Sequence, residues 1–151
     1  MSTITQAEVQ ELADIWYKKL DVHAPLEEFK PFLVSEGLKM VFPEATLAGW
    51  EKFSDWYQGG HDLPGVINIF FDEVHQVKSV VNNPTGENTS NVKVVVKWEA
   101  SVWKAPEPKS KRIMLDAYQT WEVVRSSETG KPVVLTYIVD ELKYYEGSAT
   151  L

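Results

Sequence analysis

The chain of 151 residues contains no cysteine, which excludes disulfides, thiolate nucleophiles, zinc–thiolate sites and iron–sulfur clusters. It also lacks a long apolar run: the most apolar stretch, residues 66–71, is interrupted by Asn68 and is far too short for a membrane helix. Basic residues are in the minority, 15 against 22 acidic ones, so the formal net charge is −7. Because nucleic acid and anionic membranes attract clustered positive charge, we expect neither as a partner.

What the chain does contain is typical of one folded domain, spanning residues 1–151. Its composition is 44% hydrophobic and 25% charged, and its length matches a single domain. The first residues have neither the basic start nor the apolar core of a secretory signal, so we expect a cytoplasmic protein. Aromatic residues are abundant, with six each of Trp, Tyr and Phe. A small domain with this many rings needs either a large aromatic core or an aromatic pocket.

Helices are predicted in the first part of the chain. Thr5 and Glu8 have the spacing of a capping box, so a helix is expected to begin there and to end near Asp21. Its apolar face is formed by residues at three- and four-residue spacing, namely Val9, Leu12, Ala13, Trp16 and Leu20. We predict a second, short helix over residues 26–30 and a third that is capped by Thr46 and ends at Gly59 and Gly60.

Strands dominate the rest. A short strand is predicted over residues 38–42, whereas residues 66–71 fit either a buried strand or a helical turn. Four long β-type runs follow, at residues 73–81, 92–103, 112–125 and 133–145, separated by short turn sequences rich in Pro, Gly, Asn and Ser. Short turns between long strands indicate an antiparallel meander, so the predicted class is α+β.

The last two strands are apolar at both even and odd positions, which indicates that both faces of the sheet are covered there. The helices can cover one face. We expect a second subunit to cover the other, which predicts a homodimer through the sheet face.

This order of elements resembles the NTF2-like superfamily, in particular its SnoaL-like branch, over nearly the whole chain. Three features carry the resemblance: the aromatic-then-Asp ending of the first helix, Trp16 to Asp21; Gly49 and Trp50 at the start of the third helix; and His75 at the start of the long strands. The resemblance implies N-terminal helices packed in the concave face of a curved antiparallel meander. It also implies an aromatic-lined pocket at the open end of that cone, in proteins that range from isomerases and dehydratases to domains that only bind or dimerise.

The resemblance also bears on chemistry. Ketosteroid isomerases, which are similar in layout, have a basic Asp just before a Pro on the early strand, but here Phe42 precedes Pro43. Scytalone dehydratase is more similar, because its Asp after the first helix matches Asp21 and its His on the first long strand matches His75. Its second His, on the next strand, is replaced here by Trp98 or Trp103.

Asp21 and His75 are therefore the candidate catalytic pair, in which Asp21 would orient the imidazole and His75 would move a proton. The same residues also fit a structural role, with Asp21 ending the helix and His75 as a half-buried strand residue. Candidate ligand-binding residues are Trp16, Tyr17, Trp50, Trp98, Tyr118 and Glu122, with the facing of the last two left open by the strand pattern.

The function predicted from these residues is binding of a small apolar or aromatic molecule, with proton transfer or dehydration that needs no cofactor. The alternative is a non-enzymatic dimerisation or protein-association module. A third hypothesis is a metal site built from His61, Asp62 and His75; since their spacing matches no known ligand motif, we predict no metal and no cofactor.

Overall fold

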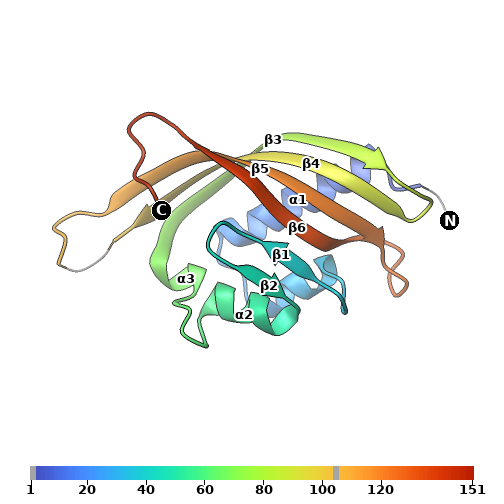
Figure 1. Cartoon of the computed structure of the whole chain (residues 1–151), viewed down its shortest axis with the longest axis horizontal. Coiled ribbons are helices and arrows are strands. Elements are labelled where there is room, and N and C mark those ends of the chain that lie inside the picture. The colour runs from blue at the N-terminus through green and yellow to red at the C-terminus, as the bar shows by residue number, and fades with distance from the viewer. Residues whose placement is uncertain (1–2, 104–105) are drawn as a thin grey trace.

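The computed structural model describes residues 3–103 and 106–151, and these form four long strands arched over a group of helices (Figure 1). The helices are α1 (Gln6–Asp21), the 3₁₀-helix η1 (Leu26–Phe32), α2 (Trp50–Gln58) and α3 (Val66–Ile69). The strands are β1 (Lys39–Val41), β2 (Thr46–Ala48), β3 (Phe70–Pro84), β4 (Thr89–Val102), β5 (Lys111–Arg125) and β6 (Pro132–Tyr144). No helix in the described ranges has the length and apolar character needed to cross a membrane.

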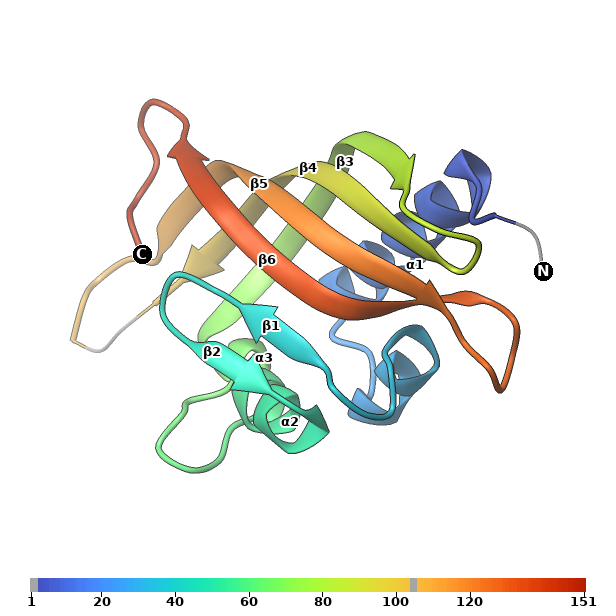
Figure 2. The same ribbon diagram turned by 45° about the vertical axis from the view of Figure 1, so that its right-hand side comes forward.

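The long strands β3 to β6 pair antiparallel with their neighbours in chain order, which confirms the predicted meander. Two short strands extend it, giving the sheet order β2-β1-β6-β5-β4-β3 (Figure 2). β1 runs parallel to β6 and β2 antiparallel to β1, so the six-stranded sheet is mixed. The parallel β1–β6 pairing joins segments about a hundred residues apart, and local sequence patterns do not reveal such a pairing.

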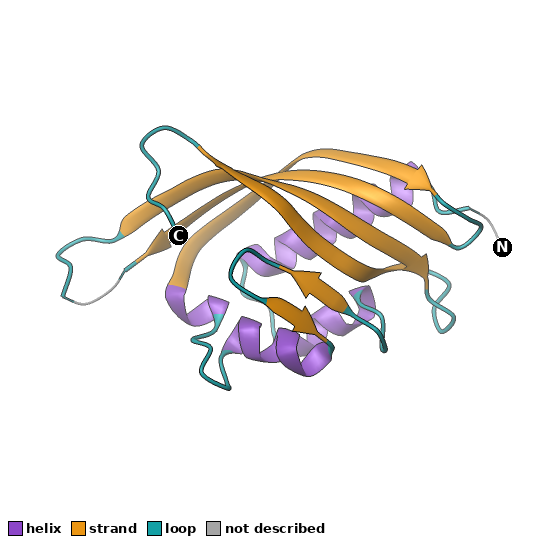
Figure 3. Ribbon diagram, viewed as in Figure 1, coloured by secondary structure: helices purple, strands orange, loops and turns teal. Residues whose placement is uncertain are grey.

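The sheet is curved and unclosed, and the helices lie on its concave side (Figure 3). Register shifts in β3 between Phe71 and Val74 and between Val77 and Ser79, with two more between β5 and β6, bend the strands. The α+β cone with helices in its concave face is thus confirmed.

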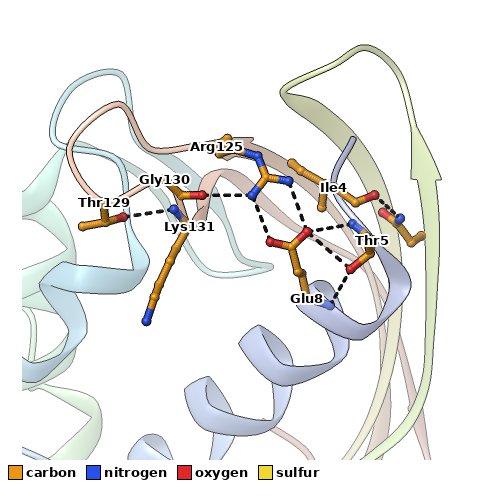
Figure 4. Close-up of polar contacts among 8 residues, drawn as sticks. Ile4, Thr5, Glu8, Arg125, Thr129, Gly130 and Lys131 are labelled. Carbon is orange, nitrogen blue, oxygen red and sulfur yellow. Dashed lines mark hydrogen bonds and ion pairs between the residues drawn. The ribbon is translucent and has the colours of Figure 1, made fainter. Parts of the chain in front are cut away.

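Helix α1 begins as the capping box predicts. The Glu8 amide donates to Thr5 Oγ1 at 3.1 Å, and the Thr5 amide donates to Glu8 Oε1 at 3.0 Å. The Glu8 carboxylate also accepts hydrogen bonds from the Arg125 guanidinium, at 2.9 and 3.1 Å, and Arg125 Nη1 donates to the Gly130 carbonyl at 2.9 Å (Figure 4). One ion pair therefore joins the start of α1 to the end of β5.

The predicted start of the third helix at Thr46 is wrong. Residues 46–48 instead form β2, because Leu47 is buried against the core and the segment pairs with β1. The helix begins at Trp50, after Gly49 with φ of 89°, and it ends at Gly59 as predicted. Pairing with β1 overrode the capping preference of Thr46.

Residues 66–71, which the sequence left open, form the helical turn α3 and the first two residues of β3.

The core lies between α1 and the concave face of the sheet and is largely aromatic. Trp16 and Trp121 are both almost fully buried, and Trp16 contacts Phe29 with ring centroids 5.2 Å apart. Phe53 and Tyr57 bring the face of α2 into the same core. These rings fill much of the space between the helices and the sheet.

Candidate functional site

A cavity of about 110 Å³ lies at the open end of the cone, between the end of α1, the turn α3 and the concave face of β3 to β6. Most of its wall is aliphatic or aromatic. The polar side chains in its wall are Tyr17, Glu44, Glu73, His75, Gln119 and Tyr137. It adjoins an outer pocket of about 410 Å³, which shares Trp56, Phe70 and Leu151 with it. Convergent polar groups in an apolar cavity are typical of a small-molecule site.

Asp21 and His75 meet at this cavity. The His75 ring Nδ1 lies 2.5 Å from Asp21 Oδ1, and the His75 backbone amide donates to Asp21 Oδ2 at 3.0 Å. The side chains are 10% exposed for His75 and 23% for Asp21. Because the carboxylate accepts the Nδ1 proton, Nε2 is the ring nitrogen of neutral His75 that is free to accept one.

Two rings flank the imidazole of His75. The ring of Tyr17 is stacked at a centroid distance of 4.9 Å, and the ring of Trp98, the strand partner of His75, lies at 6.2 Å with nearly parallel planes. The pair Asp21–His75 is itself assembled by the packing of α1 under β3, which joins residues 54 positions apart. The orientation of the imidazole is therefore fixed by a carboxylate on one edge and by rings on its faces.

Behind His75, Tyr17, Gln119 and Tyr137 form a buried hydrogen-bond cluster. Gln119 Oε1 accepts from the Tyr17 hydroxyl at 2.9 Å and from Trp121 Nε1 at 3.1 Å, and the Tyr17 and Tyr137 hydroxyls lie 2.8 Å apart. Since an indole N–H only donates, the amide oxygen must face Trp121. Gln119 Nε2 is then the donor end of the amide; Gln119 lines the cavity, and its side chain also contacts the Tyr137 hydroxyl.

Burial keeps the tyrosines of this cluster neutral. It raises the pKa of Tyr17 well above its ordinary value of 10.0, with the neighbouring Tyr137 adding to the shift. Burial likewise raises the pKa of Tyr137 to about 12, although the hydrogen bond from Tyr17 opposes the shift. The cluster is thus a neutral, preorganised wall beside the imidazole.

No family profile matches the sequence, and no curated protein matches it. The architecture does match solved structures. The LinA-type3 hexachlorocyclohexane dehydrochlorinase of Novosphingobium barchaimii LL02 superposes with a TM-score of 0.71 at 14% identity, over 97% of this chain and 93% of that chain. An NTF2-like superfamily protein of Salmonella enterica serovar Typhimurium gives 0.65 at 11% identity, over 95% and 91%. The chain has the NTF2-like fold.

A third NTF2-like relative is a protein of Novosphingobium aromaticivorans DSM 12444 described as a candidate scytalone dehydratase. Its TM-score is 0.69 at 16% identity, over 96% of this chain and 88% of that one. Identities this low establish the fold alone, and with it the resemblance predicted from the helix ending and the strand histidine.

In the NTF2-like cone the six predicted ligand-binding residues lie in four different places. Tyr17 and Trp98 line the cavity beside His75. Trp16 does not, because it is 1% exposed and surrounded by core rings. Trp50 lies against a separate surface cleft of about 680 Å³ near Arg125, whose lining contains no histidine.

Tyr118 and Glu122 do not reach the cavity. Along β5 the odd-numbered residues, including Gln119 and Trp121, point into the cone, so the even-numbered ones lie on the convex face. There Lys143 Nζ lies 4.9 Å from the ring centroid of Tyr118, and Glu122 is exposed. The sequence left this facing open, since both sets of positions carry apolar residues.

Sequence reasoning missed Glu73, Gln119 and Glu44 as cavity residues. For two of them a signal was present: Glu73 shares strand parity with His75, and Gln119 shares it with Trp121.

Among the residues described, no three His, Asp or Glu side chains are grouped as a metal site would require. His61, considered as a ligand, pairs instead with Asp55 at 2.6 Å, away from the cavity.

Proposed function

We propose that this NTF2-like protein binds a small apolar or aromatic molecule and removes a proton from one of its carbon atoms, without a cofactor. The observation that supports the proposal is the pair Asp21–His75, whose imidazole lies in the wall of a mostly aliphatic and aromatic cavity. His75 Nε2 is the base. Asp21 fixes the tautomer through Nδ1 and stabilises the imidazolium that forms, while its second oxygen holds the His75 backbone.

The cavity also supplies a group for the charge that develops on the substrate. Loss of a proton from carbon leaves negative charge, which an adjacent carbonyl oxygen can take up. The amide Nε2 of Gln119, oriented by Tyr17 and Trp121, is a fixed donor for such an oxygen. An activated C–H next to a carbonyl is therefore the substrate feature that the site fits best.

The names of two relatives agree with this class of reaction. One is a dehydrochlorinase and another is described as a candidate dehydratase, and both names denote eliminations. An elimination of this kind includes the loss of a proton from carbon. The relatives support the reaction type and leave the substrate of this chain to experiment.

Deuterium exchange tests the proton-transfer step by itself. Cyclohexanone, a small apolar ketone, is incubated with the protein in D₂O, and deuterium at the carbons beside the carbonyl is measured by NMR. We expect the native protein to accelerate exchange and His75→Gln to lower this activity by about 100-fold or more. His61→Gln is the matched control, because His61 also pairs with a carboxylate but lies outside the cavity.

Equal exchange by the native protein and by His75→Gln would contradict the proposal. If the native protein gave no acceleration at all while remaining folded by circular dichroism, the non-enzymatic association module would become the better account.

We also propose that the protein forms a homodimer through the convex face of its sheet. Apolar side chains on that face, among them Val95, Met114 and Ile138, are only half-buried in the single chain. A second subunit would cover them. Sedimentation at micromolar concentration tests this, and Ile138→Glu is expected to give a monomer; a native monomer would contradict it.

A further inference from the structure

Asp21 and His75 belong to a larger arrangement of four residues. The chain contains Asp21-Val22-His23 at the end of α1 and Glu73-Val74-His75 on β3, two segments of the form acid–Val–His. They are cross-paired: Asp21 with His75, and Glu73 Oε2 with His23 Nε2. The site therefore contains two carboxylate–imidazole pairs.

The two pairs differ in which partner is more buried, the imidazole or the carboxylate. In the first the imidazole of His75 is the more buried partner, 10% exposed, with the carboxylate of Asp21 at 23%. In the second the carboxylate of Glu73 is buried, at 3%, with the imidazole of His23 at 28%. Both His75 and Glu73 line the cavity, Asp21 and His23 line a groove on the outer surface, and Glu73 lies in the wall of both. One pair presents a nitrogen base to the cavity and the other presents a carboxyl group.

The backbone is shaped to hold Glu73 in this position. Glu73 lies within the register shift of β3 between Phe71 and Val74, and Asp72 just before it has φ of 50°. His23 has φ of 49°. Left-handed conformations at non-glycine residues are costly and persist where the surrounding structure holds them, often at functional sites.

Glu73 Oε1 accepts a hydrogen bond from Trp98 Nε1 at 3.0 Å, so both carboxyl oxygens are oriented. With Glu73 protonated on Oε1, Oε2 accepts the Nε2 proton of neutral His23. Each carboxyl oxygen has two lone-pair positions, so Oε1 can bond Trp98 and still face the cavity. The carboxyl group of Glu73 is buried, and the more exposed imidazole of His23 is bonded to it. His23 can therefore exchange protons with solvent and transfer them to Glu73.

Building on the proposed function, we propose that Glu73 is the acid of a dehydration for which His75 is the base, with His23 as the residue that reprotonates Glu73 from solvent. The substrate class is then a small β-hydroxy carbonyl compound. A hydroxyl group leaves readily only as water and needs an acid, whereas a chloride leaves as the anion and needs none.

In the balanced step, His75 Nε2 takes the proton from the carbon next to the carbonyl, and the electrons of that C–H bond form the C=C bond. The C–O bond breaks with its electrons on oxygen, which takes the Glu73 proton and leaves as water. Solvent then protonates His23 on Nδ1, and His23 passes its Nε2 proton to Glu73 Oε2. Rotation of the protonated carboxyl group returns that proton to the cavity side, while His23 recovers its Nε2-protonated form and His75 releases its proton by exchange with solvent.

The test compares two compounds that differ only in the leaving group, β-hydroxycyclohexanone and β-chlorocyclohexanone, each corrected for uncatalysed elimination. We expect Glu73→Gln to lower kcat/KM for the hydroxy compound by about 100-fold or more, and to change that for the chloro compound by less than about 3-fold. Asp72→Asn is the matched control, because it removes a neighbouring charge and Asn tolerates the positive φ of that position.

The role of His23 is tested by His23→Gly, which also tolerates a positive φ and leaves space for an imidazole. We expect this variant to lose kcat for the hydroxy compound with little change in KM, and imidazole added to the buffer to restore it. His61→Gly, at a φ of 48°, is the control and should lose nothing. A loss that imidazole does not restore would overturn the role of His23.

These outcomes separate the two proposals. Equal losses on both compounds in Glu73→Gln, or no loss on the hydroxy compound, would overturn the acid role of Glu73 while leaving His75 as the base. The acid role of Glu73 would also be overturned if the native protein eliminated chloride from the chloro compound but did not dehydrate the hydroxy compound. A different result would show that the proposed function itself is wrong: native protein that does not accelerate deuterium exchange into cyclohexanone.

Discussion

Asp21 binds His75 at two points, with one carboxylate oxygen 2.5 Å from the ring Nδ1 and the other 3.0 Å from the backbone amide. This two-point contact fixes the side chain and the strand that carries it. It also connects the last residue of α1 to β3 at the open end of the cone. The contact is thus both a structural link and the interaction that orients His75 in the cavity wall.

Asp21→Asn should separate these two roles. An amide cannot accept the Nδ1 proton as a carboxylate does, so we expect the neutral imidazole to shift toward the Nε2-protonated tautomer. Nitrogen-15 NMR of His75 measures that shift, and deuterium exchange into cyclohexanone should fall by about 100-fold. Unchanged exchange together with a changed tautomer would contradict the assignment of Nε2 as the base.

The ion pair of Glu8 with Arg125 predicts how stability depends on acid. The pKa of Glu8 is lowered from its ordinary 4.5 mainly because Arg125 donates hydrogen bonds to it, while burial opposes the shift. The stabilisation is therefore present above the ordinary pKa and is lost as pH falls through the lower folded-state value. Near neutral pH, Glu8→Gln should cost about 1 kcal/mol, because Gln keeps the capping box and removes only the charge.

This cost should disappear in acid, below both pKa values. Urea unfolding of native protein and variant at several pH values measures it. Glu11→Gln, also on α1, is the control. A cost for Glu8→Gln that stayed constant down to strongly acidic pH would contradict the electrostatic origin.

The buried tyrosines predict that the folded protein loses stability at alkaline pH. The pKa of Tyr137 is raised from 10.0 to about 12 mainly by burial, so the unfolded chain loses the phenolic proton first. The stability that this difference provides is complete below pH 10.0 and declines as pH rises toward about 12. Stability measured by urea unfolding should fall less steeply in this window for Tyr137→Phe than for the native protein. Tyr144→Phe, at an exposed position, should leave the slope unchanged.

Two glycines with similar backbone angles should differ strongly when changed to alanine. Gly65 has φ of 87°, and a Cβ there would lie 2.5 Å from backbone atoms of Gln58 and Gly59. Gly130 has φ of 74° and nothing within 4 Å of such a Cβ. We expect Gly130→Ala to cost about 1 kcal/mol from the backbone alone, and Gly65→Ala clearly more, measured by urea unfolding. Equal costs would show that the contact of α2 with the turn before α3 is loose.

Several elements could be predicted from the sequence because their signals are local. The capping box at Thr5 and Glu8 marked the start of α1, and the turn sequence after Arg125 marked the end of β5. The turn sequence predicted after residue 81 did not end β3, which continues to Pro84. The start of α2 was predicted wrongly, because Thr46 has the properties of a cap but lies in a segment that pairs with β1. That pairing depends on the position of β1, which is set by the distant strand β6.

The same division applies to the site. Asp21 and His75 were predicted through a family resemblance, and Tyr17 and Trp98 as aromatic candidates for the wall. Tyr118 and Glu122 were placed with them only because β5 is apolar at both parities, so the pattern did not show which set faces the cone. The pairing of His23 with Glu73 had no signal in either segment alone.

Local sequence signals were sufficient to predict the α+β order, the meander, and the limits set by an acidic chain without cysteine. These follow from short-range rules of capping, turns and alternation. The tertiary structure alone decided which rings fill the core, which face of β5 is concave, and that two acid–Val–His segments cross-pair. Those outcomes depend on how α1 packs under a bent sheet, where burial and contacts between distant residues fix each side chain.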